Sequence, residues 1–283
     1  MLQRPPVFVH LLPALIPPGS LEGGVAVVID VLRATTVMLH ALAAGCDAIL
    51  PCGEVEEARK LAATFPEGGA LLAGERHGEP IEGFQLGNSP GQFTPSLCSG
   101  KTIVMTTTNG TRAILASLAA ERVLVAGFVN WKATANLLKA DGRPIHLICA
   151  GTDGQVSLED TMLAGALADD LDSWAWDAAG DESNVLKLGD TPVDTILAND
   201  SAEIAAALWH ETSALQGEGY PLADSLSDGR GGRRNLELGN DVDIEDAARV
   251  DQFPFAAELL RDPLRIVPAS DSAGPRLRLF GAS

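Results

Sequence analysis

The sequence has few basic residues. Its 283 residues include 20 Lys and Arg against 38 Asp and Glu, so the formal net charge is −18. Nucleic-acid backbones and anionic lipid surfaces are bound by basic surfaces, and this chain offers little basic surface to either. We therefore expect no nucleic-acid partner and no membrane partner. Net charge does not exclude a small anion, which a few arginines can bind locally.

Cysteine is also scarce, and long apolar runs are missing. The four cysteines are far apart and form no CxxC pair, which favours reduced intracellular thiols over a disulfide framework or a zinc site. Three prolines between residues 13 and 18 interrupt the N-terminal apolar stretch, and no run approaches the roughly 20 residues that cross a membrane. We expect a soluble cytoplasmic protein without a signal peptide.

Hydrophobic residues make up 46% of the chain and recur in a regular alternation. Apolar runs rich in β-branched residues predict strands at residues 24–30, 47–52, 70–75, 101–107, 122–128 and 144–151. Ala- and Leu-rich segments predict helices at residues 38–45, 54–65 and 111–120, and from residues 130 and 157 onward. This alternation indicates a three-layer α/β/α fold with a mostly parallel sheet covered on both faces.

The last third, from about residue 171, differs in composition, because Lys187 is the only basic residue between Arg143 and Arg230. It predicts helices at residues 201–216 and 243–250 and short strands at residues 265–267 and 276–280. We interpret residues 1–283 as a single α/β chain, with two subdomains (about 1–125 and 126–283) as an alternative. The similarity of DVLRATTVMLHALAAG to TTTNGTRAILASLAA allows two similar halves, and more simply two βα units built alike.

Ligands of such sheets bind at the carboxyl ends of the strands, so polar residues there are candidate site residues. The strand at 24–30 ends in Asp30, and Arg33 follows directly. Asp30 could bind Mg²⁺ or attack phosphorus, and Arg33 could clamp an anionic oxygen. The alternative is that Asp30 only caps the helix that follows. The two readings are equally supported.

Residues 106–112, TTTNGTR, form a second polar strand end. Hydroxyls, a glycine that permits close backbone approach, free helix amides and an arginine converge within one turn. Helix N-termini bind phosphate-like anions, so we favour anion binding over a simple Asn-Gly turn. The Walker pattern GxxxxGK[ST] is absent.

Other strand ends are weaker candidates. We interpret the glycine-punctuated loop 74–90 as an active-site cover, with His77 as a solvated loop histidine. Glu159 and Asp160 lie in a first helical turn, where the helix dipole alone favours acids. Cys149 is assigned to packing, because nothing nearby in the sequence activates its thiol. The basic patch GRGGRRN at residues 229–235 is equally compatible with anion binding and with a flexible surface turn.

These motifs together resemble a known family. VVIDVLRATT, GER…IEGF…LGNSP, TTTNGTRA, CAGTDG…SLED and the late GRR…LELG…DIE pattern occur, over about residues 25–251, in the order typical of 2-phosphosulfolactate phosphatases. The resemblance implies a Mg²⁺-dependent enzyme that releases phosphate from 2-phosphosulfolactate, giving sulfolactate on the route to coenzyme M. It also makes a homodimer plausible.

The resemblance implies roles for individual residues. The metal site would consist of Asp30, Glu75, Glu159 and Asp160. Catalysis would depend on Asp30, Arg33 and Arg112. Substrate would be bound by Arg76, Asn88, Thr107, Thr108, Asn109, Gly110, Thr111, Arg233 and Arg234. Two departures from the family pattern are Gln85, where the family usually has the acid of GFDLGNSP, and SDGRGGRRN, where a His-Gly-Arg-Arg pattern is common.

The expected chemistry is Mg²⁺-assisted hydrolysis of a phosphate monoester on a small, multiply anionic carboxylic acid. Two routes stay open: in-line attack by a water held by the metal, or attack by Asp30 to form an aspartyl phosphate. The alternative functions are a phosphatase for another small phosphorylated carboxylic acid and a non-catalytic receptor for a small anion.

Overall fold

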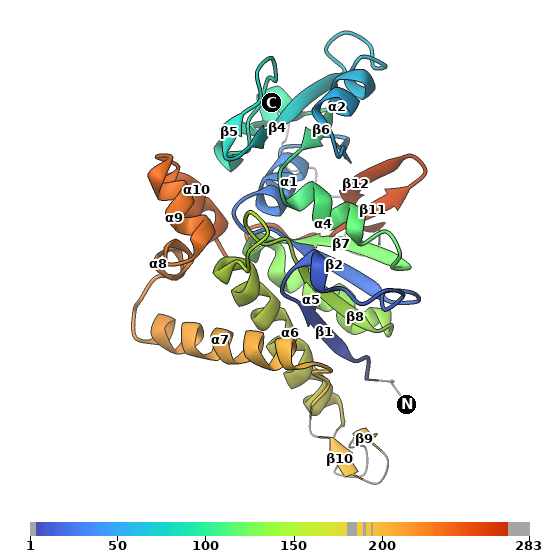
Figure 1. Ribbon diagram of the computed structural model, residues 1–283, viewed down its shortest axis with the longest axis vertical. Coiled ribbons are helices and arrows are strands. Elements are labelled where there is room, and N and C mark those ends of the chain that lie inside the picture. Colours follow the sequence, from blue (N-terminus) through green and yellow to red (C-terminus); the bar gives the residue numbers. More distant parts are fainter. Residues whose placement is uncertain (1–3, 180–185, 189–190, 194, 271–283) are drawn as a thin grey trace, which may run out of the picture.

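The described strands form one large sheet and one small hairpin (Figure 1). The structure is a computed structural model that describes residues 4–179, 186–188, 191–193 and 195–270. The large sheet has the strand order β1-β8-β2-β7-β11-β12-β3-β6-β4-β5. In that order its strands are Val7–His10, Ile145–Cys149, Val25–Ile29, Arg122–Ala126, Ala257–Arg261, Leu264–Pro268, Ala48–Pro51, Thr102–Thr106, Ala70–Arg76 and Glu79–Pro80. The hairpin pairs β9 (Leu186–Leu188) with β10 (Thr191–Val193).

Two parallel groups of strands make up most of the large sheet. β1, β8, β2 and β7 pair in parallel, and so do β3, β6 and β4. The antiparallel strands β11 and β12 join the two groups, because β11 pairs with β7 and β12 pairs with β3. The expected α/β fold with a mostly parallel sheet is therefore confirmed.

Helices connect these strands. The α-helices in the described residues are α1 (Ala34–Ala43), α2 (Val55–Ala62), α3 (Pro95–Cys98), α4 (Gly110–Ala116), α5 (Trp131–Asp141), α6 (Leu158–Ala179), α7 (Asp200–Gly217), α8 (Leu222–Ser227), α9 (Arg230–Glu237) and α10 (Asp241–Ala247). Short 3-10 turns are η1 (Pro13–Leu15), η2 (Pro90–Gln92) and η3 (Phe128–Asn130). α1 leads from β2 to β3 and α4 leads from β6 to β7, so both helices cross between the two strand groups. The two similar sequence segments are these crossover units.

Helices cover both faces of the sheet, and β2 shows how. Val25, Val27 and Ile29 pack in a core with α5, α6 and α7, whereas Ala26 and Val28 pack on the other face with α1 and α4. Successive side chains of a strand point to opposite faces, so a strand buried on both sides is apolar throughout. α2 contributes to a smaller core with β3 and β6.

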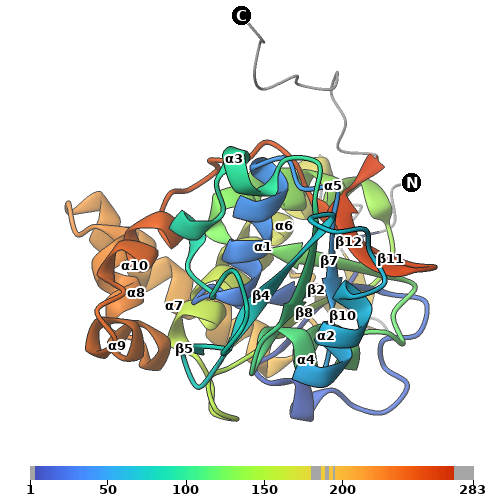
Figure 2. The ribbon, with the colours of Figure 1, turned by 90° about the horizontal axis from the view of Figure 1, so that it is seen from above.

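Beyond α7, three short helices form an arm, which we define as α8–α10, residues 222–247. Both views place the arm on one side of the molecule and the β11–β12 hairpin on the opposite side (Figure 1 and Figure 2). Leu226, Ile244 and Ala247 of the arm belong to the same apolar core as α6 and β2. The arm is therefore packed onto the α/β body.

The alternation in the sequence predicts β2, β3, β4, β6, β7 and β8, and all six are confirmed. It does not predict β1, a short strand close to three prolines, or β11. It also misses α9, whose glycine-rich first turn equally suits a flexible loop. The strand expected at 276–280 lies outside the described residues, and the division near residue 125 stays a prediction.

The structure bears on the expectations for membrane-spanning segments and for the cysteines. No helix in the described part of the chain combines the length and apolarity needed to cross a bilayer. All four cysteines are free and buried. Burial raises the pKa of the Cys149 thiol well above its usual range, which keeps the thiol protonated and agrees with a packing role.

Candidate active site

The site begins where α1 and α4 meet. Gly110 is the first residue of α4, and a Cβ atom built on it would lie 2.5 Å from the Cβ atom of Ala34 and 2.7 Å from Oδ2 of Asp30. Only glycine leaves room for this approach. The Asp30 carboxylate therefore lies between the first turns of two helices that follow strands of different groups.

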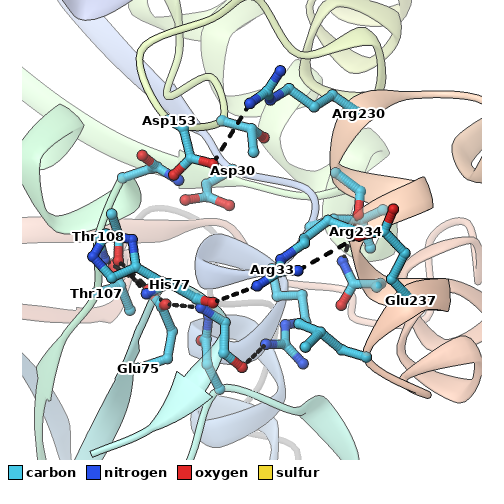
Figure 3. Close-up of a pocket in the computed structure, with 18 residues that line it drawn as sticks. Asp30, Arg33, Glu75, His77, Thr107, Thr108, Asp153, Arg230, Arg234 and Glu237 are labelled. Atoms are coloured by element: carbon cyan, nitrogen blue, oxygen red, sulfur yellow. Dashed lines mark hydrogen bonds and ion pairs between the residues drawn. The ribbon is translucent and has the colours of Figure 1, made fainter.

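A pocket of about 380 Å³ opens at this point. In Figure 3, Asp30, Thr107 and Thr108 enter it from the α/β body, and Arg230 and Arg234 enter it from the arm. The lining residues are Asp30, Leu32, Arg33, Glu75, His77, Gly78, Asn88, Thr107, Thr108, Asn109, Thr152, Asp153, Arg230, Gly231, Arg234, Asn235, Glu237 and Leu238. The pocket thus combines residues from all four predicted polar strand ends with the basic patch of the arm.

Asp30 is a buried acid of this pocket. Its Oδ1 accepts a hydrogen bond from the amide of Ala34 at 3.1 Å, at the start of α1. Burial raises the pKa of Asp30 to about 7; the hydrogen bond from Ala34 lowers it, and the charges of Glu75 and Glu159 raise it. The carboxylate thus caps the start of α1 and also lines the pocket, and its metal-binding or catalytic role stays a prediction.

Glu75 lines the pocket, but the surrounding loops occupy its oxygens. Oε1 accepts a hydrogen bond from the amide of Thr108 at 2.7 Å. Oε2 accepts one from the amide of Gly78 at 2.7 Å and one from the Thr108 hydroxyl at 3.2 Å. The carboxylate thus clamps the turn after β4 to the turn after β6. Metal binding by Glu75 stays a prediction.

Asp160 forms a similar clamp outside the pocket lining. Its Oδ1 accepts a hydrogen bond from the amide of Val31 at 2.8 Å, and its Oδ2 accepts one from the amide of Gly151 at 3.0 Å. Burial raises the pKa of Asp160 well above its usual range, and the charges of Asp30 and Glu159 raise it further. Asp160 therefore ties the turn after β2 to the turn after β8.

Glu159 is fully buried beneath the first turn of α9. A Cβ atom on Gly231 would overlap with its Oε1, and one on Gly229 would overlap with its Oε2. Neither oxygen has a hydrogen-bond partner of good geometry among the described residues. Burial raises the pKa of Glu159, while Ser157, Gly231 and the charge of Arg233 lower it. The glycines of the basic patch are thus required where α9 passes over this carboxylate.

Three arginines line the pocket. Arg33 is buried, whereas Arg230 and Arg234 are exposed residues of α9, four positions apart. Arg234 donates a hydrogen bond to the carbonyl oxygen of His77 at 3.2 Å, and Arg230 lies 3.8 Å from Oδ2 of Asp153. Positions four apart share one face of a helix, so the arm presents a pair of guanidinium groups to the pocket.

The other arginines assigned from the sequence lie outside this lining. Arg76 is turned towards the loops behind the pocket, where it donates a hydrogen bond to the Thr106 hydroxyl at 2.8 Å. Arg112 is exposed on α4. Arg233 is exposed on α9, and its guanidinium contacts the carbonyl oxygen of Asp228. Their catalytic or binding roles stay predictions.

The 107–111 loop is held by its own side chains. The hydroxyl oxygens of Thr107 and Thr111 lie 3.1 Å apart, and the amide of Thr107 donates to Thr111 Oγ1 at 3.0 Å. Thr107, Thr108 and Asn109 line the pocket. Asn88 does so as well, and its buried Oδ1 has no hydrogen-bond partner among the described residues. Such an oxygen is available to a ligand.

Comparison with known proteins gives a family match over most of the chain. The sequence model of the family described as 2-phosphosulpholactate phosphatase matches residues 10–261. The chain belongs to the 2-phosphosulfolactate phosphatase family. A relative from Prochlorococcus marinus is 38% identical over 238 residues, 83% of this chain and 89% of the relative. One from Symbiobacterium thermophilum is 39% identical over 230 residues, 81% and 88% of the two chains.

A third relative, from Caldanaerobacter subterraneus, is 44% identical over 147 residues, 52% of this chain and 61% of the relative. All three are named probable 2-phosphosulfolactate phosphatases, so the resemblance seen in the sequence is confirmed. Gln85, which stands where the 2-phosphosulfolactate phosphatase pattern usually has an acid, is exposed and accepts the amide of Leu72 at 2.8 Å. That departure from the family pattern lies outside the pocket lining.

Several residues at or next to the pocket were not assigned from the sequence, among them Arg230 and Asp243. Arg230 belongs to the basic patch, but nothing local separates it from Arg233. Asp243, in the DIE part of the 2-phosphosulfolactate phosphatase pattern, forms a buried ion pair with Arg33 at 2.6 Å. The two residues are 210 positions apart, and the sequence contains no local signal that they meet.

Mg²⁺ is held in proteins mainly by oxygen donors, several of which lie at this site. In the part of the chain that the structure describes, no three His, Cys, Asp or Glu side chains gather as a metal-binding group. The oxygens of Glu75 and Asp160, and Oδ1 of Asp30, already accept backbone hydrogen bonds. Among the carboxylate and amide oxygens of the buried lining residues that the structure describes, this leaves Oδ2 of Asp30 and Oδ1 of Asn88 and Asn235. Mg²⁺ usually binds one or two carboxylates and keeps waters and substrate phosphate oxygens, so these residues fit such an ion.

Proposed function

We propose that this chain is a Mg²⁺-dependent phosphatase that hydrolyses 2-phosphosulfolactate to sulfolactate and phosphate, as a step towards coenzyme M in the cytoplasm. Family membership and the names of the relatives support the reaction class. The observation that carries the proposal is Asp30, a buried carboxyl group whose pKa is raised to about 7, in one pocket with Arg33, Arg230 and Arg234. A homodimer stays a prediction.

The charges in the pocket support a divalent cation. Beside its three arginines, the pocket is lined by four acids, which are Asp30, Glu75, Asp153 and Glu237. These side chains alone give no excess of positive charge for a phosphate monoester that carries further acidic groups. A cation bound at Asp30 would supply that excess, and bound Mg²⁺ would also neutralise charge on the transferring phosphoryl group.

The lining residues suggest a division of roles. Arg33 and the polar groups of the 107–109 loop would bind the phosphoryl oxygens. Arg230 and Arg234 would bind the carboxylate or sulfonate at the other end of the substrate. Asp30 can hold a cation or attack phosphorus only as the carboxylate. Turnover therefore requires its deprotonated form on either route.

The test is phosphate release from a substrate panel by the purified full chain. 2-Phosphosulfolactate is compared with phospholactate and 3-phosphoglycerate, after EDTA treatment and then with Mg²⁺ restored. We expect turnover only with Mg²⁺ and the highest kcat/KM for 2-phosphosulfolactate. Equal or higher kcat/KM for a substrate without the sulfonate would show that the enzyme acts on another phosphorylated carboxylic acid.

A calorimetric titration separates the enzyme from a receptor. Tight binding of 2-phosphosulfolactate with no phosphate released over hours in Mg²⁺ would contradict a phosphatase and indicate a non-catalytic anion-binding protein. The buried acids around Asp30 favour the enzyme, because a receptor for an anion gains nothing from carboxylates beside its ligand.

A further inference from the structure

Asp243 lies behind the pocket, where both of its oxygens are used. Oδ2 forms the ion pair with Nη1 of Arg33 at 2.6 Å, and Oδ1 accepts a hydrogen bond from the Ser89 hydroxyl at 2.5 Å. The side chains of Arg33 and Asp243 are 7% and 4% exposed, so solvent screens this pair little. Asp243 does not line the pocket, and its side-chain hydrogen bonds among the described residues are those with these two partners.

Arg33 needs a partner such as Asp243 to fix the orientation of its guanidinium group. Its side chain is long and flexible, and a guanidinium group binds phosphate oxygens well only when its planar donors face them. Asp243 takes Nη1, and the carbonyl oxygen of Gly78 lies 3.4 Å from Nη2. Both contacts hold the guanidinium group of Arg33, which is one of the lining residues drawn in Figure 3. The orientation of the guanidinium thus depends on a residue of the arm.

Through Ser89, Asp243 is also linked to Asn88, a second residue of the pocket. Ser89 follows Asn88, which lines the pocket with an unpartnered, buried Oδ1 among the described residues. η2 begins directly after Ser89, and α10, which carries Asp243, packs against η2. One carboxylate of the arm is therefore bonded both to the cationic side chain and to the loop of the neutral oxygen donor.

We propose that Asp243 is a positioning residue for the phosphatase reaction. It holds the Arg33 guanidinium and, through Ser89, the Asn88 loop in the orientation that binds the phosphoryl group. The proposal rests on the proposed function, because it assigns Arg33 to that group. It makes the arm part of the catalytic arrangement, since an arm displaced from the body would release Arg33.

If Asp243 only stabilised the fold, its replacement would lower stability but leave kcat/KM of the folded protein unchanged. A double-mutant cycle separates this structural role from the positioning role. The variants are Asp243→Asn, Arg33→Lys and the double variant, assayed for kcat and KM with 2-phosphosulfolactate in Mg²⁺. Misplacing a substrate-positioning group by about 1 Å costs on the order of 100-fold, so we expect Asp243→Asn to lower kcat/KM by about 10- to 100-fold. The new amide oxygen in Asp243→Asn can still accept the Ser89 hydroxyl, so this substitution acts mainly through Arg33. The double variant should therefore be no worse than about threefold below Arg33→Lys alone.

Asp246→Asn is the matched control. Asp246 is also a buried acid of α10, but it pairs with Arg249 at 3.2 Å and not with a pocket residue. It should keep kcat/KM within about threefold of the wild type, by the additivity of independent sites. Losses that multiply in the double variant, or an Asp243→Asn protein that is less stable but has wild-type kcat/KM when folded, would overturn the proposal.

Two further measurements keep the test decisive. Ser89→Ala removes the hydrogen bond between Ser89 and Asp243 and leaves the ion pair of Asp243 with Arg33 in place. It replaces Asp243→Asn as the test if that variant does not fold. Wild-type activity of Ser89→Ala would then count against the proposal. If the wild type cleaves no phosphate monoester, the proposed function fails first. The same cycle is then run on the affinity for inorganic phosphate, and equal affinity in all four proteins would overturn the positioning role separately.

Discussion

The carboxylate of Glu159 lies against the backbone of Gly231 so closely that a Cβ atom at position 231 would overlap with Oε1. Glu159 belongs to α6 of the α/β body, and Gly231 belongs to the first turn of α9 in the arm. This turn also carries Arg230, and Arg234 follows one turn later. The placement of Arg230 and Arg234, the two arginines that the arm contributes to the pocket, therefore depends on a position that must lack a side chain.

We expect Gly231→Ala to lower the free energy of unfolding by about 1–3 kcal/mol, the usual cost of overpacking, because α9 must move away from Glu159. The shift also moves Arg230 and Arg234, so kcat/KM should fall. Urea unfolding and phosphate release measure the two effects. Gly217→Ala is the control, since nothing lies within 4 Å of the added Cβ atom at the end of α7. A Gly231→Ala protein with wild-type stability and activity would contradict this packing.

Asp30→Asn should lower kcat by at least about 100-fold, the lower bound for loss of a positioned acid–base group, and by more if Asp30 attacks phosphorus itself. Asparagine keeps the size of the side chain and can still accept the amide of Ala34, so the fold should persist. Phosphate release measures the loss of kcat, and circular dichroism shows whether the fold persists. Asp47→Asn, at an exposed position before β3, is the control. Wild-type hydrolysis by Asp30→Asn would remove Asp30 from the catalytic group.

Local patterns in the sequence are sufficient to predict the strands and the polar strand ends, because both depend on neighbours along the chain. They find Asp30, Glu75 and Asp160, but they do not distinguish a carboxylate with a free oxygen from one whose two oxygens clamp neighbouring turns together. That difference depends on which amides lie opposite: Thr108 and Gly78 for Glu75, and Val31 and Gly151 for Asp160. Such long-range partners are absent from any short window of sequence.

The arm shows the same limit. Its glycines look like a flexible loop when read alone, and only the carboxylate of Glu159 beneath them explains why α9 needs Gly229 and Gly231. Likewise, β11 is an ordinary short strand whose importance lies in joining β7 to β12. The family pattern gives the order of the motifs along the chain, whereas the contacts between them depend on the fold.

Glu75→Gln tests whether Glu75 is a clamp or a metal ligand. An amide nitrogen would face the N–H of Thr108 or of Gly78, so one backbone donor loses its acceptor, at a cost of about 1–3 kcal/mol in the free energy of unfolding. As a clamp, Glu75 should change KM and stability while the Mg²⁺ concentration for half-maximal activity stays the same. A rise of that concentration by tenfold or more would make Glu75 a ligand. Glu79→Gln, at an exposed position of β5, is the control.

The raised pKa of Asp30 predicts how stability depends on pH in the absence of divalent ions. The folded protein holds this proton up to about pH 7, whereas the unfolded chain releases it near pH 3.8. The folded state therefore binds more protons between these values, and its free energy of unfolding must fall as the pH rises through that window. For Asp30 alone, the total loss is on the order of 4 kcal/mol.

Asp30→Asn isolates this contribution, because asparagine does not titrate. Urea unfolding in EDTA at pH 5 and pH 8 should show a smaller loss of stability in Asp30→Asn than in the wild type or in Asp47→Asn. Adding Mg²⁺ at pH 8 should stabilise the wild type but not Asp30→Asn, since an ion that binds only the folded carboxylate removes the cost of its buried charge. Equal pH dependence in the wild type and Asp30→Asn would show that the folded protein does not hold the Asp30 proton, and a metal response in both would place the ion on other residues.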